Sequence, residues 1–187
     1  MTLLRFLATL VLALVLIAPL TSRAADIGGP FSLIDHYGNR VTHESYNGKY
    51  LLIFFGYSFC PDICPTELLV MGQTLDKLGN DAARIQALFI TIDPERDTSE
   101  AFAQYMPNFH PDLVGLTGTS EEVAATAKSY RVYFRKGEKK AGETTYLMSH
   151  SSIVYFMSPK SEYLTHFVLD QDAETLAERI KAIIDEH

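Results

Sequence analysis

The two cysteines of the chain, Cys60 and Cys64, lie four positions apart and follow directly after an apolar run at residues 51–55. All the thiols of the protein are therefore in one short segment, at the end of a predicted buried strand. Thiolates in such a place serve either thiol–disulfide exchange or the binding of a soft metal ion. A helix N-terminus favours thiolate over thiol, so we expect both side chains to ionise readily.

Alternating strands and helices are predicted to position this segment. The predicted strands lie at residues 31–34, 40–42, 50–57, 84–93, 113–116, 132–135, 151–157 and 162–169. The predicted helices lie at residues 66–78, with Pro65 at the first helical position, and at 98–106, 119–130 and 173–184. Residues 50–57 are too apolar for a strand with one solvated face, so this strand should be central in a covered sheet.

This order of elements predicts an α/β fold with a central mixed sheet flanked by helices. Residues 31–42 should form an N-terminal hairpin, and the polar segment near residues 136–145 an inserted hairpin loop. Because the cysteines end a strand and open a helix, the arrangement is predicted to be thioredoxin-like. Thioredoxin-type redox motifs have two residues between the cysteines instead of three, which weakens the interpretation as a simple oxidoreductase without removing it.

A metal site needs a third ligand, and among the six histidines only His150 is predicted to lie near the cysteines. It directly precedes the strand predicted at residues 151–157, whose start packs opposite the cysteine turn in a thioredoxin-like sheet. Two thiolates and one imidazole suit copper, and zinc is possible if water or a fourth ligand completes a tetrahedron. Surface or packing roles suffice for His36, His43, His110, His166 and His187.

Three further side chains have simpler interpretations than metal binding. Met148 could add a thioether to a copper site, but core packing is the usual role of methionine. Asp62 is expected to accept backbone hydrogen bonds at the turn. Asp93 and Asp97 could suggest a site for a hard metal ion, but they precede a predicted helix, where capping explains them.

Composition limits the classes of function. The chain has 187 residues, of which 47% are apolar and 21% charged, which is typical of one globular domain. A domain of this size buries roughly two-thirds of its unfolded surface, so it needs no disulfide to fold. The net charge is −7 and no dense cluster of lysine and arginine is present, which argues against nucleic acid as a partner.

The N-terminus has the pattern of a targeting segment. Arg5 precedes an apolar stretch at residues 6–20, and Ser22 and Ala24 are the small residues expected before a cleavage site. We therefore predict that residues 1–24 are a signal peptide, with an uncleaved membrane anchor as the alternative, and that residues 25–187 form the domain. In either case the domain is predicted to be periplasmic, where a working dithiol must be kept reduced or bound to metal.

Four segments resemble the Sco/SenC family, the thioredoxin-like copper-handling proteins of cytochrome c oxidase assembly. They are FGYSFCPDICPTEL at residues 55–68, TIDPERDT at 91–98, YRVYF at 130–134 and MSHSS at 148–152, followed by Tyr155 and Pro159. The resemblance implies that Cys60, Cys64 and His150 bind copper for the dinuclear copper site of oxidase subunit II. The family often has histidine before the first cysteine and aspartate before the ligand histidine, where this chain has Phe59 and Ser149.

Two functions are therefore predicted, and they are compatible. The first is a copper metallochaperone that delivers one copper ion to an acceptor cuproprotein and depends on a thiol reductant. The second is an extracytoplasmic thiol–disulfide oxidoreductase that uses Cys60 and Cys64, without His150, to reduce the cysteines of the acceptor. A purely structural disulfide is a weaker alternative, because so short a loop yields roughly 2 kcal/mol or less. A thiol peroxidase is also a weaker alternative, because no residues beside Cys60 resemble a set that activates peroxide.

Overall fold

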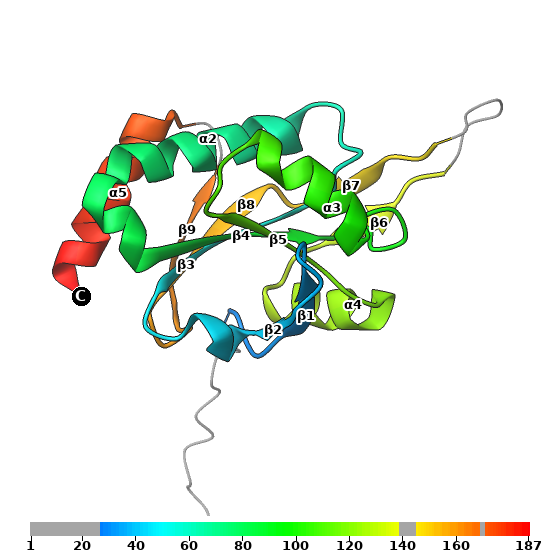
Figure 1. Ribbon diagram of the computed structural model, residues 1–187, viewed down its shortest axis with the longest axis horizontal. Helices are drawn as coiled ribbons and strands as arrows, with labels where there is room; N and C mark the ends of the chain where they lie inside the picture. Colours follow the sequence, from blue (N-terminus) through cyan, green and yellow to red (C-terminus); the bar gives the residue numbers. More distant parts are fainter. Residues whose placement is uncertain (1–26, 139–144, 169–170) are drawn as a thin grey trace, which may run out of the picture.

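The computed structural model describes residues 27–138, 145–168 and 171–187. Its centre is a seven-stranded sheet in the order β2-β1-β5-β4-β3-β8-β9 (Figure 1). The strands of this sheet are β1 (Ser32–Asp35), β2 (Arg40–Thr42), β3 (Tyr50–Gly56), β4 (Ile85–Thr91), β5 (Leu113–Thr117), β8 (Ile153–Met157) and β9 (Tyr163–Val168). A separate two-stranded sheet consists of β6 (Phe134–Lys136) and β7 (Met148–His150).

Helices cover both faces of the large sheet (Figure 1). One face carries α2 (Ile63–Leu78), α3 (Ser99–Tyr105) and α5 (Ala173–Glu186), and α4 (Ser120–Ser129) lies on the opposite face. Three short 3-10 helices, η1 (His43–Tyr46), η2 (Gly79–Arg84) and η3 (Met106–Asn108), complete the described elements. This confirms the predicted α/β fold with a mixed sheet between helices.

Strand β3 is the strand that leads to the cysteines, and all seven of its residues are buried. It pairs in parallel with β4 and antiparallel with β8, which confirms the predicted central position. A strand that is covered on both faces by apolar side chains is held rigidly. The loop after Gly56 therefore starts from a fixed point.

The N-terminal hairpin is also as predicted, and α4 begins with a capping box. Strands β1 and β2 are antiparallel. The Thr119 hydroxyl accepts a hydrogen bond from the amide of Glu122 at 3.2 Å, and the Glu122 carboxylate accepts one from the amide of Thr119 at 2.8 Å. This reciprocal pair satisfies two amide groups that have no partner inside the helix.

Two predicted boundaries are wrong. Helix α2 begins at Ile63, so Cys64 lies in its first turn and Pro65 is the third helical residue. Proline is tolerated there because the first amides of a helix have no intrahelical acceptor. The strand predicted at residues 151–157 begins only at Ile153, as β8, and a separate strand that was not predicted, β7, ends at His150 before it.

The predicted signal peptide or anchor, residues 1–24, lies outside the described residues, as does most of the predicted hairpin loop. The flanks of that loop do form an antiparallel hairpin, in which Phe134 pairs with His150. No helix in the described ranges has the length and apolar character needed to cross a bilayer.

Candidate metal centre

Cys64 and His150 meet at the end of the sheet where α2 begins. The Sγ atom of Cys64 lies 3.5 Å from Nε2 of His150, although the two residues are 86 positions apart. Cys64 is fully buried, and His150 is half-buried on the short strand β7. The hairpin β6–β7 thus brings the predicted imidazole to the predicted thiol.

Cys60 lies in the loop between β3 and α2 and is half-buried. Its amide donates a hydrogen bond to the carbonyl of Tyr57 at 3.3 Å, which closes a tight turn. The two cysteines are free thiols that interact, since Cys60 contributes to the raised pKa of Cys64. Within the described ranges no three His, Cys, Asp or Glu side chains are grouped closely enough to form a ready metal site.

The hydrogen bond of the other ring nitrogen fixes the state of the His150 imidazole. Its Nδ1 lies 3.1 Å from the carbonyl oxygen of Ser151. A carbonyl can only accept, so Nδ1 carries the proton and the lone pair of Nε2 faces Cys64. Burial lowers the pKa of His150, which keeps the ring neutral. A neutral imidazole oriented by a backbone carbonyl is the form that binds metal.

The Cys64 thiol does not follow the expectation of easy ionisation. Burial raises its pKa well above the usual range, and this outweighs the lowering effect of the hydrogen bond from the Tyr57 backbone. The free-energy cost of moving a thiolate out of water therefore exceeds the stabilisation that the N-terminus of α2 gives to its charge. In the reduced, metal-free protein Cys64 is a thiol, and a metal ion must displace its proton.

The donor set fits a soft metal ion. Metal–sulfur and metal–nitrogen bonds in protein sites of this kind measure about 2.3 and 2.0 Å, so one ion can contact both donors when they lie within about 4.3 Å of each other. The separation of Cys64 Sγ and His150 Nε2 is 3.5 Å. Thiolate and imidazole ligands together suit copper or zinc and exclude magnesium and calcium.

Ser149 stands where the family often has aspartate, but His150 still has partners that orient its ring. Ser149 is exposed on β7 and pairs with Arg135 in the hairpin. The orientation of His150 comes instead from the Ser151 carbonyl and from the Tyr57 ring, which packs edge to face with the imidazole at 6.1 Å between centroids. The backbone of this chain therefore does what an outer carboxylate does at other histidine ligands.

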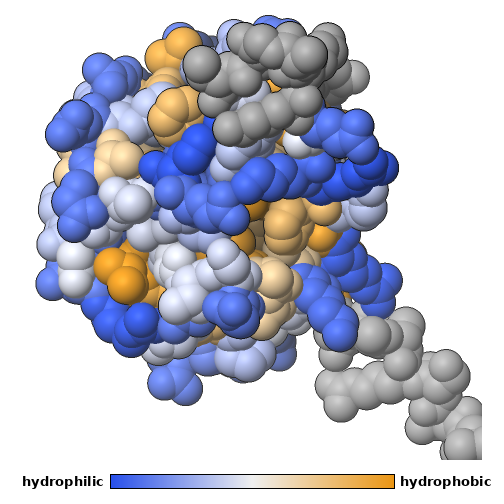
Figure 2. All heavy atoms as spheres, turned by 90° about the vertical axis from the view of Figure 1, so that its right-hand side faces the viewer, coloured by the Kyte–Doolittle hydropathy of each residue, from blue (hydrophilic) through white to orange (hydrophobic). Residues whose placement is uncertain are grey.

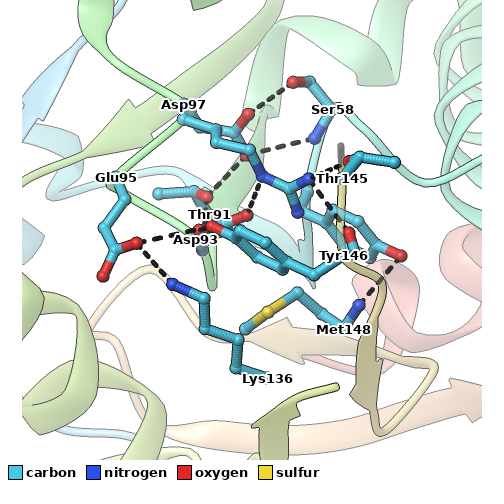
Figure 3. Close-up of polar contacts among 11 residues, drawn as sticks. Ser58, Thr91, Asp93, Glu95, Asp97, Lys136, Thr145, Tyr146 and Met148 are labelled. Atoms are coloured by element: carbon cyan, nitrogen blue, oxygen red, sulfur yellow. Dashed lines mark hydrogen bonds and ion pairs between the residues drawn. The ribbon is translucent and has the colours of Figure 1, made fainter. Parts of the chain in front are cut away.

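The buried carboxylate of Asp97 anchors the cysteine loop, a role that the sequence did not reveal. Asp97 accepts hydrogen bonds from the Ser58 amide at 3.1 Å, from the Ser58 hydroxyl and from the Thr91 hydroxyl at 2.7 Å (Figure 3). The predicted capping role is wrong, because Thr98 caps α3 by accepting from the amide of Ala101. Asp97 ties the loop before Cys60 to the end of β4.

Asp93 belongs to a second group of polar contacts next to the first (Figure 3). Its carboxylate accepts from Nε of Arg96 at 2.5 Å and from the hydroxyl of Tyr146 at 2.8 Å. These bonds give the buried Asp93 carboxylate its partners, so neither a capping role nor a hard-metal site is needed to account for it. The roles of Ser58, Arg96 and Tyr146 were not predicted from the sequence. The only indication was that Ser58 and Arg96 lie in the family-like segments at residues 55–68 and 91–98.

The remaining predicted side chains behave as follows. Asp62 stands at the N-cap of α2, but its carboxylate accepts no capping hydrogen bond, so that expectation is wrong. Met148 packs against the core, as predicted, and its amide donates to the hydroxyl of Tyr57 at 3.2 Å. His36 has a structural role, because its Nδ1 accepts from the amide of Gly115 at 3.1 Å.

Glu67 lies one turn of α2 after Cys64 and is only 3% exposed. Its Oε2 atom has no hydrogen-bond partner among the described residues, and burial raises its pKa from 4.5 to about 7. The folded state therefore binds this proton more tightly than the unfolded state, so the free energy of unfolding should fall as pH rises from 4.5 to about 7. We expect Glu67→Gln to remove this part of the pH dependence.

Urea unfolding of the wild type and Glu67→Gln at pH 5 and pH 8 checks this expectation. The variant should gain stability relative to the wild type at pH 8 and show a smaller difference at pH 5. The exposed Glu178→Gln is the matched control and should follow the wild type at both values. A difference between wild type and Glu67→Gln that does not change with pH would contradict the assignment.

Comparisons with known proteins relate this chain to one protein family. A model of the family described as SCO1/SenC matches residues 20–185. The human protein named "Protein SCO1 homolog, mitochondrial" is 48% identical over 143 residues, which is 75% of this chain and 47% of that protein. The chain spans about half the length of the curated relatives that it matches first.

Solved structures extend the likeness to three dimensions. The copper-bound crystal structure of ScoI from Arabidopsis thaliana aligns with a TM-score of 0.80 and 40% identity, over 86% of this chain and 99% of that one. Copper-bound ScoI from Bradyrhizobium japonicum gives a TM-score of 0.77 and 42% identity, over 83% and 98% of the two chains. The fold described above is the fold of these proteins.

Proposed function

Because this chain belongs to the SCO1/SenC family, we propose that it binds one copper ion through Cys60, Cys64 and His150 and delivers it during assembly of cytochrome c oxidase. The copper-bound structures of ScoI support the choice of metal. The expected acceptor is the dinuclear copper site of oxidase subunit II or another cuproprotein. A thiol reductant must keep the two cysteines open for copper.

The observation that carries this proposal is the approach of Cys64 Sγ to His150 Nε2 at 3.5 Å. An unprotonated imidazole nitrogen and a thiol that face each other at this distance are two donors that one soft metal ion can bind together. Here Nδ1 bonds to a carbonyl and Nε2 is directed at a thiol. The more accessible Cys60 is then the ligand at which exchange with the thiols of an acceptor begins.

Replacing His150 with alanine tests the third ligand. We expect reduced, anaerobic full-length protein to bind one copper ion per chain, and His150→Ala to weaken binding by more than about tenfold, or about 1.4 kcal/mol. Competition with a copper(I) chelator measures the affinity, and absorption and EPR spectra report the thiolate and imidazole ligands. His166→Ala is the matched control, since His166 is exposed on β9. Equal affinities of His150→Ala and the wild type would refute the proposed ligand set.

A second function is supported by the unequal burial of the cysteines. Cys60 is half-buried and Cys64 fully buried, so a substrate disulfide would be attacked by Cys60 and the mixed disulfide resolved by Cys64. The acceptor's disulfide is thereby reduced to two thiols and the Cys60–Cys64 pair is oxidised. His150 has no part in these steps, so His150→Ala should retain thiol exchange while it loses copper affinity.

We also infer the placement of the domain. Residues 1–24 export the domain of residues 25–187 to the periplasm, either as a cleaved signal peptide or as a membrane anchor. The composition of this segment supports the inference. Mass measurement of the mature N-terminus after expression distinguishes a cleaved chain from an anchored one.

A further inference from the structure

Arg96 lies between the two parts of the chain that carry the proposed ligands. It belongs to the loop between β4 and α3, and its side chain is 15% exposed. Its amide donates to the carbonyl of Asp93 at 3.1 Å and its Nε donates to the carboxylate of the same residue at 2.5 Å. The first bond holds the backbone of the loop, and the second, which is charge-assisted, holds the guanidinium beside Asp93.

The guanidinium binds the hairpin that ends at His150. Its Nη1 atom donates to the hydroxyl of Thr145 and to the carbonyl of Tyr146, each at 3.0 Å. The Cζ atom of the group lies over the Tyr146 ring, 3.7 Å from the ring centroid, and the Tyr146 hydroxyl in turn donates to Asp93 (Figure 3). The segment just before His150 is thus fixed to the β4–α3 loop at three points.

The same guanidinium packs against the cysteine loop. It lies 4.7 Å from the ring centroid of Phe59 and 5.6 Å from that of Tyr57. Phe59 directly precedes Cys60, and its ring is 53% exposed beside the guanidinium. Arginine, unlike lysine, can hydrogen-bond along its edge while it stacks on aromatic faces.

We propose that Arg96 is a positioning residue, which sets the distance between the cysteine loop and His150 by binding both. This inference rests on the proposed function, because it concerns the ligand set proposed there. Phe59 then has a specific role in this chain, as the face against which the guanidinium stacks. On the face of the molecule that Figure 2 shows, hydrophobic residues form small separate groups between hydrophilic ones.

A double-mutant cycle tests the proposal. Copper(I) affinity is measured for the full-length wild type, Arg96→Ala, His150→Ala and the double variant. We expect Arg96→Ala to weaken binding about 10- to 100-fold in the wild-type background, as is usual for residues that orient a metal ligand, and by less than about twofold in the His150→Ala background. An equal loss in both backgrounds, or no loss in the wild-type background, would overturn the proposal.

The cycle separates this inference from the proposed function. If His150→Ala weakens binding and Arg96→Ala does not, the ligand set stands and the role of Arg96 falls. If His150→Ala binds as tightly as the wild type, both fall. Should Arg96→Ala not fold, Arg96→Lys takes its place in the same cycle, since lysine keeps the charge beside Asp93 but cannot form the planar contacts.

Amide hydrogen exchange of the metal-free protein provides a second test of the proposal. The amide of Met148, which donates to Tyr57, should exchange its hydrogen about tenfold faster in Arg96→Ala, because the hairpin opens more often. Arg84→Ala is the matched control, as Arg84 also pairs with an aspartate three residues earlier and lies 5.7 Å from the centroid of an aromatic ring, that of Tyr50. Unchanged exchange at Met148 in Arg96→Ala, or an equal increase in Arg84→Ala, would overturn the proposal.

Discussion

Serine in place of Cys64 is expected to abolish copper retention, reducing the stoichiometry from one ion per chain to a trace. The hydroxyl is a hard donor that stays protonated at neutral pH, whereas copper(I) requires a soft thiolate. Cys64 is also the donor that the structure places nearest to His150. Cys64→Ser therefore removes the thiol that lies beside His150, whereas loss of Cys60 or His150 leaves this thiol in place.

Metal analysis after gel filtration of anaerobically loaded protein measures this effect. Thr74→Ser is the matched control, because Thr74 is buried in the same helix and loses only a methyl group, keeping the hydroxyl that bonds to the Val70 carbonyl. The control should retain one copper ion. Full copper retention by Cys64→Ser would show that the metal is held elsewhere.

The same variant also separates the two proposed functions. When Cys60 of this variant attacks a disulfide of the acceptor, one acceptor sulfur leaves as a thiol and the other stays bound to Cys60. Without Cys64 this mixed disulfide cannot be resolved by the second cysteine of the chain, so the covalent complex should accumulate. His150→Ala should form no such complex. A trapped complex in Cys64→Ser, together with normal copper loading of the acceptor when His150→Ala replaces the wild type, would favour the oxidoreductase over the carrier.

The predictable part of the site came from residue types whose chemistry is rare. Two cysteines and one suitably placed histidine could be selected from the sequence because thiolates and imidazoles have few uses at the end of a strand. The central strand β3 was also predictable, since seven buried residues leave an uninterrupted apolar run. Local patterns of this kind can be recognised in the sequence without knowledge of the fold.

The network around the site could not be predicted, because its bonds join residues far apart. Ser58 and Asp97 are 39 positions apart, and Tyr146 and Asp93 are 53 positions apart. Such pairs leave no periodic pattern, and aspartate before a helix suggests a cap whether or not it forms one. The pKa of Cys64 was misjudged for the same reason, since its burial depends on tertiary packing.

Gly56 is the local feature that decides where the Cys64 side chain can lie. A Cβ atom on Gly56 would stand 2.8 Å from Cys64 Sγ and 2.8 Å from the Phe89 ring. Both neighbours are fully buried, so neither can move aside without disturbing the core. Gly56 therefore keeps open the space that the thiol occupies beside His150.

We expect Gly56→Ala to lower the free energy of unfolding by about 1–3 kcal/mol, the usual cost of overpacking a core, and to weaken copper binding by displacing Cys64. Gly115→Ala is a matched control on β5, where a Cβ would stand 2.7 Å from Phe102 and 2.8 Å from Met106. Urea unfolding should show a comparable loss of stability in both variants, whereas chelator competition should show weaker copper binding only in Gly56→Ala. Equal copper affinities in two destabilised variants would mean that Cys64 adapts to the added methyl group, and that the position of its sulfur is set by the cysteine loop and not by the end of β3.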